Sequence, residues 1–452
     1  MSKKTIRILA SLFLTVLLVL LSYLFFVKEE RNLAYDAPEQ TYATAPMETQ
    51  ATVPDVTEES TEPPTTEPEE TEPEYVKTSI TLSAIGDIML HDAVMDSCYD
   101  RSSKTYDFSS IFTYVSDHLQ AADYAVVNFE GTLGGSSYGI SGYPMFNSPD
   151  SILDGLKNAG VDILLTANNH CYDTYSEGLH RTMDKVTESN LLHLGTKKNA
   201  EDPNYIILEQ GEIRIGLACY TYETSTSKNS KYINGIPVKQ GDAALINSFN
   251  LHYLDSFYDE ADLTISQMKE EGVDAIVYFM HWGSIYSRKV NSQQLEISQK
   301  LCDLGVDVII GGHPHVVQAA DLLTSTQDDN HKTVCLYSMG NAVSNQRGIY
   351  TKEVPTKHTE DGVMFQVTFT QQKDGTVVLE SAEAIPIWVN MATNPKSGKK
   401  EYNILPLDKS IQDWKTAFDL TDATLADAQA SYERSMELVG SGMAKINAYL
   451  AN

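Results

Sequence analysis

From Thr78 onward, short apolar runs alternate with segments of helical pattern, and this alternation restricts the fold more than any other feature of the sequence. The runs at 80–85, 124–127 and 161–165 have the length and composition of buried strands. Buried strands separated by helices are typical of an α/β domain whose sheet is largely parallel. Two later hairpins predict that this sheet is mixed or that a second sheet is present.

The predicted elements follow from this pattern of short apolar runs and longer segments with helical spacing. We expect strands at 80–85, 124–127, 161–165, 205–208, 213–219, 275–279, 306–310, 334–337, 364–370 and 377–380. We expect helices at 111–120, 148–160, from about 175, 262–271, 292–304 and 421–450.

The N-terminal region contains a run of twenty residues without a charge, at 8–27. At about 1.5 Å per residue, a helix of this length spans roughly 30 Å, the thickness of the hydrocarbon core of a bilayer. Lys3, Lys4 and Arg7 precede the run, so the positive-inside bias predicts a cytoplasmic N-terminus and export of the rest of the chain. We therefore expect a single-pass membrane protein; a cleaved signal peptide is the alternative.

The segment that follows, 28–76, is expected to be a disordered linker. It holds two basic and fourteen acidic side chains and is rich in threonine, glutamate and proline. Like charges repel and prolines favour extended backbone, so no packed core is expected there. The predicted organisation is a cytoplasmic tail at 1–7, a membrane anchor at 8–27, this linker at 28–76, a folded domain at 77–395 and a C-terminal extension with a helix at 396–452.

The whole chain is strongly acidic, with 62 acidic and 33 basic side chains and a formal net charge of −29. A surface of this charge repels phosphate backbones, so a nucleic acid is not an expected partner. Five scattered cysteines without a C-x-x-C pair argue against a structural zinc site and against a dense disulfide framework.

Polar residues that can bind metals come directly after the expected strands. In open α/β sheets, ligands bind outside the carboxyl ends of the strands, so side chains at these positions are expected to meet at one edge. Each motif taken alone could be an ordinary turn. The residues at these strand ends are Asp87, Glu130, Asn169, His170, His281, His313 and His315.

The strongest of these motifs is Gly312-His313-Pro314-His315. Two histidines two residues apart on extended backbone point to the same face, and a proline favours extended backbone in the residue before it. Paired imidazoles suit metals that take nitrogen ligands. The full set of carboxylates, amide and imidazoles could hold two divalent ions about 3.5–4 Å apart, which would clamp a phosphoryl group and lower the pKa of a bridging water.

His170 is expected to have a different role from its neighbour Asn169, because adjacent side chains point to opposite sides of the local backbone. From that position the imidazole could hydrogen-bond developing charge or donate a proton to a leaving group. We therefore name His170 as the candidate catalytic residue.

Six motifs resemble the signature of the CapA/PgsA capsule-synthesis family, whose members are similar to calcineurin-like metallophosphoesterases. The resemblance covers about 79–345, in order and spacing, and implies a four-layer α/β/β/α sandwich. The motifs are G-D-I-M at 86–89, N-F-E at 128–130, A-N-N-H at 167–170, H-W-G at 281–283, G-G-H-P-H at 311–315 and Y-S-M-G-N at 337–341.

The resemblance also implies a division of the ligands between two metals. Asp87 and His315 would hold one ion, and Glu130 would bridge the two. The other ion would be held by Asn169, His281 and His313.

Two residues depart from the metallophosphoesterase pattern. Met89 stands where those enzymes have a histidine, so one ion is expected to lack a ligand, and His91 could replace it only if the chain bends. Glu130 stands where they have an aspartate, which is one methylene shorter.

The resemblance implies a membrane-anchored, exported protein of capsule or poly-γ-glutamate synthesis or export, with a site for divalent metals (Mn, Zn or Fe). Its expected partners are the membrane, through the N-terminal helix, and a polymer synthase or export complex. The expected substrate is an anionic polymer or a phosphoester. The alternatives are an exported metal-dependent phosphoesterase or amide hydrolase that acts on the cell envelope, and a binding module without catalysis. If the chain is an enzyme, we expect a metal-dependent hydrolase.

Overall fold

The computed structural model describes residues 77–348, 356–394 and 398–451, all of which belong to one unit of the chain. The membrane helix expected at 8–27 and the linker expected at 28–76 lie outside the described residues. Among the residues that are described, no helix has both the length and the apolar character needed to cross a membrane.

A first mixed sheet has the strand order β19-β18-β17-β1-β4-β5-β6, with β16 also paired to β1. Its strands are β1 (Ser79–Ile88), β4 (Tyr124–Phe129), β5 (Ile163–Leu165), β6 (Leu192–Leu194), β16 (Asn341–Val343), β17 (Asp361–Gln371), β18 (Val377–Thr393) and β19 (Lys400–Pro406). Strands β1, β4, β5 and β6 are parallel, whereas β17, β18 and β19 are antiparallel to their neighbours. The C-terminal extension expected from residue 396 thus contributes β19 to this sheet.

A second mixed sheet has the order β11-β8-β12-β13-β15-β14, with β7 paired to β8. Its strands are β7 (Tyr205–Gln210), β8 (Ile213–Glu223), β11 (Ser248–Asn250), β12 (Ala275–His281), β13 (Val308–Gly312), β14 (Ala320–Thr324) and β15 (Lys332–Leu336). Strands β8, β11, β12, β13 and β15 are parallel, and β7 and β14 run antiparallel to them. Two small hairpins stand apart from both sheets: β2 (Tyr99–Asp100) with β3 (Thr105–Tyr106), and β9 (Tyr232–Ile233) with β10 (Ile236–Pro237).

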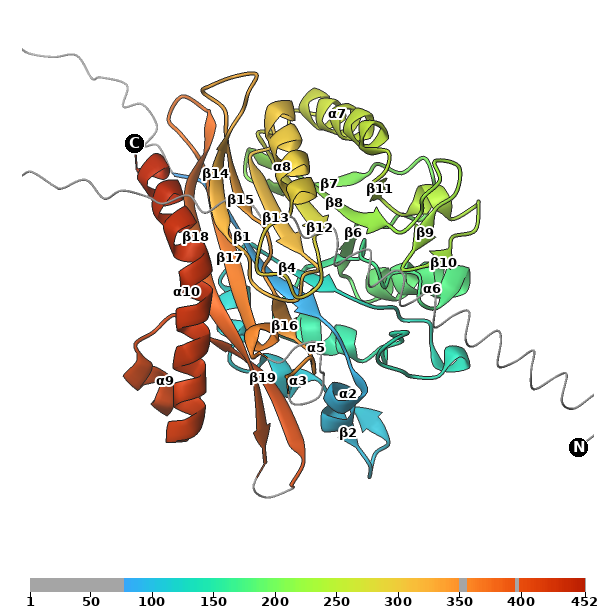
Figure 1. Ribbon diagram of the computed structural model, residues 1–452, viewed down its shortest axis with the longest axis vertical. Helices are drawn as coiled ribbons and strands as arrows, with labels where there is room; N and C mark the ends of the chain where they lie inside the picture. Colours follow the sequence, from blue (N-terminus) through green and yellow to red (C-terminus); the bar gives the residue numbers. More distant parts are fainter. Residues whose placement is uncertain (1–76, 349–355, 395–397, 452) are drawn as a thin grey trace, which may run out of the picture. The chain divides into compact units, whose positions relative to one another are not determined.

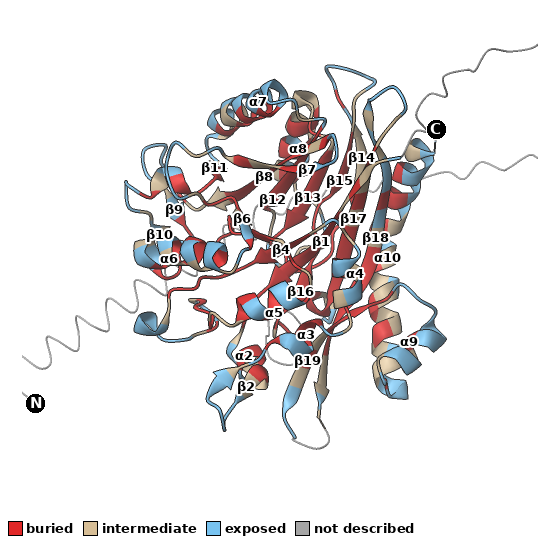
Figure 2. Ribbon diagram, turned by 180° about the vertical axis from the view of Figure 1, so that it is seen from behind, coloured by how far each residue is buried: buried red, intermediate tan, exposed pale blue. Residues whose placement is uncertain are grey.

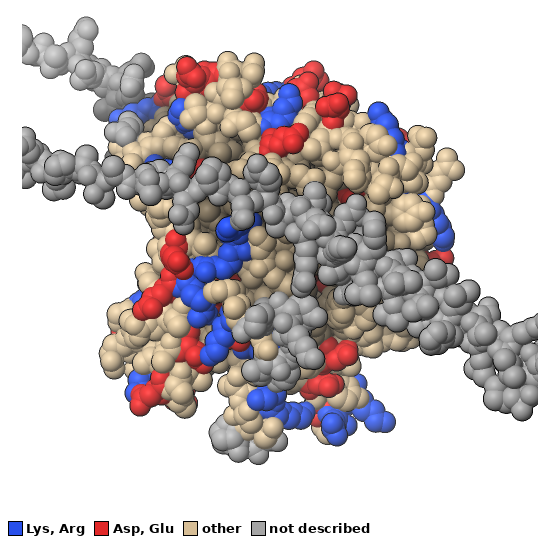
Figure 3. Space-filling model, viewed as in Figure 1, with Lys and Arg blue, Asp and Glu red and all other residues tan. Residues whose placement is uncertain are grey.

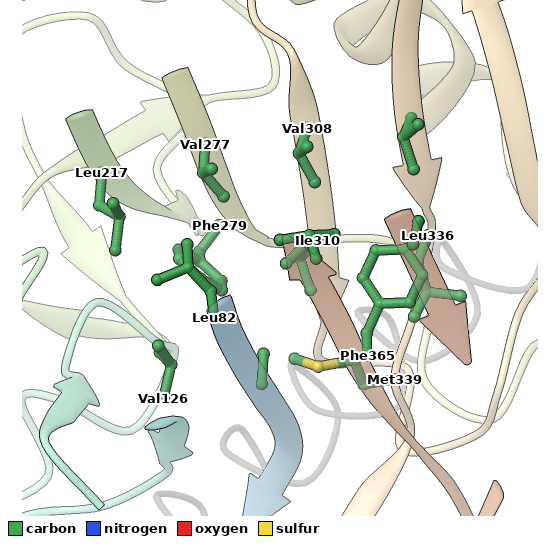
Figure 4. Close-up of a cluster of buried hydrophobic side chains, with 14 of the residues drawn as sticks. Leu82, Val126, Leu217, Val277, Phe279, Val308, Ile310, Leu336, Met339 and Phe365 are labelled. Atoms are coloured by element: carbon green, nitrogen blue, oxygen red, sulfur yellow. The ribbon is translucent and has the colours of Figure 1, made fainter. Parts of the chain in front are cut away.

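The two sheets pack against each other through their inner faces, and the side chains between them form the largest part of the core. Figure 4 shows Leu82 and Val126 from the first sheet beside Leu217, Val277 and Ile310 from the second. Because successive side chains of a strand point to opposite faces, the neighbours of these residues face outward into two further clusters. The strands read as continuous apolar runs because both faces of each sheet are buried.

Helices cover the outer face of each sheet, as the burial colours in Figure 2 show. The helices on the first sheet are α2 (Asp92–Cys98), α3 (Ser109–Phe112), α4 (Ser116–Gln120) and α5 (Ile152–Asn158). The helices on the second sheet are α7 (Leu254–Glu270) and α8 (Ser292–Leu304). Helix α6 (Tyr175–Glu188) packs in a separate small cluster. The mixed α/β fold expected from the sequence is confirmed.

The C-terminal helix α10 (Asp422–Leu450) packs on strands of both sheets, β18 and β14 (Figure 1). Its residues Val439, Met443 and Ile446 belong to the core between the sheets. A Cβ on Gly442 would lie 1.8 Å from the carbonyl oxygen of Ala320, so only glycine permits this close approach of helix and strand. The short helix α9 (Ile411–Ala417) precedes it.

On the face that carries α10, basic and acidic side chains lie close together, as Figure 3 shows. Ion pairs tie residues of this helix to other segments, among them Arg288–Glu437, Lys357–Asp427 and Lys445–Asp321. Arg434 of the same helix pairs with the buried Asp361 at the start of β17. These contacts hold α10 across the edge of the two sheets.

Candidate metal centre

Six side chains expected to bind metal converge at the carboxyl ends of strands from both sheets. The first sheet supplies Asp87 in β1, Glu130 directly after β4 and Asn169 after β5. The second sheet supplies His281, the last residue of β12, and His313 and His315 after β13. All six are buried, with at most 4% of each residue exposed. Parallel strands end at the same edge of a sheet, which is why residues far apart in the sequence meet here.

Asp87 is held by strands on both sides of β1. It is paired with Asn128 of β4 and with Asn341 of β16, and its backbone N–H donates to the carbonyl of Gly340 at 3.0 Å. A Cβ on Gly86 would lie 1.9 Å from that same carbonyl oxygen. The glycine of the G-D-I-M motif therefore permits the close approach of the Y-S-M-G-N motif, and the two motifs together position the carboxylate.

The two histidines after β13 do not lie on extended backbone, and in this respect the sequence prediction was wrong. The φ angle is +93° at His313 and +58° at His315. Non-glycine residues in this region typically cost about 1–3 kcal/mol each, and such strain is concentrated at functional sites. Neighbouring contacts hold the turn: Asn341 Nδ2 donates to the carbonyl of His315 at 3.3 Å, and the Tyr286 N–H donates to that of Pro314 at 2.8 Å.

Ligand atoms from the two sheets approach one another closely. His315 Nδ1 lies 3.0 Å from Asp87 Oδ2, and His281 Nε2 lies 2.9 Å from Asn169 Oδ1. Oε1 of Glu130 is 3.8 Å from His281 Nε2 and 3.7 Å from His315 Nε2. The carboxylate of Glu130, which comes from the first sheet, therefore lies beside two imidazoles of the second sheet.

Two groups of these residues have ligand atoms that all lie within 4.8 Å of one another. One group is Asp87, Glu130 and His281, and the other is Glu130, His313 and His315. Glu130 belongs to both, as a bridging carboxylate would. The first group combines Asp87 and His281, which the family resemblance assigns to different ions. The close contacts Asp87–His315 and Asn169–His281 agree with that assignment. The division of the ligands between two ions therefore stays a prediction.

The donor set fits divalent metal ions. Within the described part of the chain, Oε1 of Glu130 and Nδ1 of His313 are buried without a hydrogen-bond partner. Buried polar atoms are normally satisfied, and leaving one unpaired costs free energy. Carboxylate and imidazole are ordinary ligands of such ions, so metal coordination would satisfy both atoms.

The pKa shifts of the buried groups also favour a metal site. Burial raises the pKa of Glu130 well above its usual range, and the charges of Asp87 and Asp173 raise it further. Burial lowers the pKa of His281 and of His313 well below the usual range, and neighbouring histidines lower it further. These two imidazoles are therefore neutral at neutral pH, the state in which histidine binds metal.

His170 lies beside this cluster and pairs with Asp173, which we did not identify from the sequence. His170 Nδ1 is 2.7 Å from Asp173 Oδ2, and that oxygen also accepts the backbone N–H of Phe146 at 2.7 Å. A hydrogen bond from Nδ1–H to the carboxylate leaves Nε2 of the imidazole for a substrate. The only available signal was the position of Asp173, one turn after His170.

Met89 and His91 belong to neither group of candidate ligands among the described residues. Met89 is buried, and its sulfur accepts from Gln346 Nε2 at 3.9 Å. His91 precedes α2, and its Nδ1 accepts the backbone N–H of Asn345 at 3.3 Å. Burial lowers the pKa of His91 to about 4. The chain does bend after β1, but His91 is in neither ligand group.

Comparison with known proteins identifies the family of this chain. Residues 81–346 match the profile of a family described as "Bacterial capsule synthesis protein PGA_cap". The capsule biosynthesis protein CapA of Bacillus anthracis is 25% identical over 279 residues, which is 61% of this chain and 62% of that protein. The PGA biosynthesis protein CapA of Bacillus subtilis (strain 168) is 25% identical over 360 residues, 76% of this chain and 84% of that one.

Two solved structures are also similar. The NAD nucleotidase NadN of Haemophilus influenzae has a TM-score of 0.42 at 12% identity, covering 83% of this chain and 68% of that one. The calcineurin-like phosphoesterase YfkN of Bacillus subtilis has a TM-score of 0.40 at 14% identity, covering 80% and 99%. Both scores lie below 0.5, and the evidence for the fold is the arrangement of sheets and helices in this chain.

Proposed function

Because the chain belongs to the family of bacterial capsule synthesis proteins described as PGA_cap, we propose that it acts in the synthesis or export of a capsule polymer through a centre of two divalent metal ions. The convergence of carboxylate, amide and imidazole ligands from two sheets carries the metal part of the proposal. The polymer part rests on the family and on the names of the two relatives, one of which is a PGA biosynthesis protein.

The proposal includes a location. Residues 8–27 anchor the chain in the cell membrane with the N-terminus in the cytoplasm, and 28–76 hold the folded domain away from the outer surface. The expected partners are a polymer synthase or export complex, and the expected substrate is an anionic polymer or a phosphoester. The charge pattern of the first residues supports this orientation.

We further propose that the domain is of metallophosphoesterase type, with a four-layer α/β/β/α arrangement. Two sheets packed face to face, helices on both outer faces and ligands at the strand ends support this assignment. The residues that would hold the ions (Mn, Zn or Fe) are Asp87, Glu130, Asn169, His281, His313 and His315. Ions held there would orient a phosphoryl or carbonyl group and lower the pKa of a bound water.

The chain's own contribution to chemistry is the His170–Asp173 pair. Asp173 fixes the orientation of the imidazole through its contact with Nδ1, as carboxylates do for catalytic and metal-bound histidines. Nε2 can then hydrogen-bond a substrate oxygen or pass a proton to a leaving group. The ring of Phe146 packs edge-on against His170 with the centroids 4.8 Å apart, which excludes water from one side of the imidazole.

A second candidate function is hydrolysis of a phosphoester, or of an amide of the polymer, by an exported metal-dependent enzyme. The buried His170–Asp173 pair favours it, because a domain that only binds its ligand has no need of an oriented proton donor. A binding module without turnover is the remaining alternative.

The polymer role is tested by deleting the gene in the organism that makes this chain and measuring extracellular polymer. We expect the polymer to be lost, to return with the wild-type chain and to stay absent with Glu130→Gln at equal expression. Polymer that is unchanged by the deletion would contradict the role.

Catalysis is tested on the purified full-length chain with phosphomonoesters, phosphodiesters and polymer under added Mn²⁺, Zn²⁺ or Fe²⁺. We expect His170→Ala to lower kcat by about 10²–10⁴-fold, the usual contribution of a general acid or base, while the bound metal stays constant. Metal binding without turnover of any substrate would favour the binding module.

A further inference from the structure

Asn128 of β4 lies between the two carboxylates of the centre. Its Nδ2 is 2.7 Å from Asp87 Oδ1, 3.3 Å from Glu130 Oε2 and, more remotely, 3.5 Å from His281 Nδ1, and the residue is buried. A side-chain amide nitrogen carries two hydrogens, so a single amide can donate to both carboxylates. Asn128 is in neither group of candidate metal ligands.

The contact distinguishes the two oxygens of Glu130. Oε2 accepts from Asn128, whereas Oε1 has no hydrogen-bond partner among the described residues and faces the imidazoles of the second sheet. Oε1 is the oxygen near His281 and His315, at 3.8 and 3.7 Å. The amide thus occupies one oxygen and leaves the other for the centre.

A second amide fixes which way Asn128 faces. Asn128 Oδ1 accepts from Asn168 Nδ2 at 3.2 Å, and Asn168 Nδ2 also donates to the carbonyl of Phe129 at 2.8 Å. Asn168 Oδ1 in turn accepts the backbone N–H of His170 at 3.1 Å. If Asn128 were turned over, its oxygen would face two carboxylates and its nitrogen would face another donor, so only the present orientation satisfies all of these groups.

We propose that Asn128 is a positioning residue that makes Glu130 bridge two metal ions through a single oxygen. By holding Oε2, it prevents the carboxylate from binding one ion with both oxygens, which would leave the second ion without its shared ligand. The inference rests on the proposed metal centre and assigns the residue that decides whether one ion or two are bound. Partners of metal ligands typically change metal affinity by about 10–100-fold.

The test uses the purified full-length chain, with Mn²⁺ as the probe. Asn128→Leu keeps the approximate size of the side chain and removes both donors. The matched control is Asn247→Leu, since Asn247 is also buried and its side chain donates to the carbonyl of Asn204 at 2.8 Å. Calorimetric titration measures the number of ions and their Kd, and electron paramagnetic resonance distinguishes an exchange-coupled Mn²⁺ pair from isolated ions.

We expect the wild type and Asn247→Leu to bind two ions with a coupled spectrum. Asn128→Leu should bind one ion with wild-type affinity, show the spectrum of an isolated ion, and bind the second about 10–100-fold more weakly. A purely structural role for Asn128 would lower the thermal stability without changing the number or coupling of the ions, and that result would overturn the inference.

If Asn128→Leu does not fold, Asn128→Ala provides the test, because a methyl group donates to neither carboxylate. Two coupled ions with wild-type affinity in this variant would also overturn the inference. A wild-type chain that binds no Mn²⁺, Zn²⁺ or Fe²⁺ would instead overturn the proposed metal centre itself, and the two failures are therefore distinguishable.

Discussion

The two sheets contribute different chemistry to the same centre. The first sheet supplies oxygen donors, from Asp87, Glu130 and Asn169. The second sheet supplies imidazoles, from His281, His313 and His315. Burial opposes charge in both halves, since it raises the pKa of Glu130 and lowers the pKa values of His281 and His313. The difference shows why the site suits cations: the first sheet supplies carboxylate and amide oxygens, the second supplies imidazole nitrogens, and both candidate ligand groups contain residues of both sheets.

The largest expected effect on metal affinity is that of Glu130→Gln, because Glu130 belongs to both candidate ligand groups. We expect metal affinity to fall by more than about 100-fold, since even partners of metal ligands change it by about 10–100-fold. Elemental analysis of the purified full-length chain should find less than one ion per chain. Retention of two ions at wild-type affinity would show that Glu130 is not the shared ligand.

A second prediction sharpens the comparison through the pH dependence of the metal-free chain. His281 and His313 have lowered pKa values, so below their ordinary value of about 6.5 the unfolded chain binds more protons and the folded state loses stability as pH falls. Glu130 has a raised pKa, so it opposes this trend and lowers stability as pH rises through that pKa. Each group changes the free energy of unfolding by up to about 1.4 kcal/mol per pH unit.

Urea unfolding in the presence of a chelator measures this dependence at pH 5.0, 6.5 and 8.0. We expect the wild type to lose stability between pH 6.5 and 5.0, and Glu130→Gln to lack the decrease that the carboxyl causes at higher pH. A metal-free stability that is constant across this range in both the wild type and Glu130→Gln would contradict the protonation states inferred for His281 and His313.

The smallest expected effect concerns His91, on the side of the first sheet. Its Nδ1 is already bonded to the Asn345 N–H, and it belongs to neither ligand group, so His91→Ala should change metal affinity by less than about two-fold. Titration with Mn²⁺ at pH 7 measures this directly. A loss of one ion would show that His91 replaces the ligand missing at Met89.

The sequence alone predicted the main elements and the convergence of the candidate ligands, because each of these residues lies at the end of a buried apolar run. Helix α8 occupies the expected residues, and it begins with a capping box between Asn291 and Gln294. Helix α7 begins at Leu254, earlier than expected at 262, since its cap residue Tyr253 makes no side-chain cap and offers no such signal. The helix expected at 111–120 is divided into α3 and α4.

Other features depended on contacts that no local pattern contains. The left-handed turn at His313 and His315 opposes the local preference of a residue before proline, and Asn341 and Tyr286 from other segments hold it. Asn128, quoted only within the N-F-E motif, and Asp173 were not assigned to the site, because their positions in the sequence do not identify the side chains that they contact.

Asp87 and His315, whose side chains lie 3.0 Å apart, are separated by 228 positions in the chain. A nascent polypeptide that has been synthesised only through β6 offers carboxylates and amides without any of the three imidazoles. Metal content would then be a measure of completed folding, since neither half of this protein holds the whole set of candidate ligands.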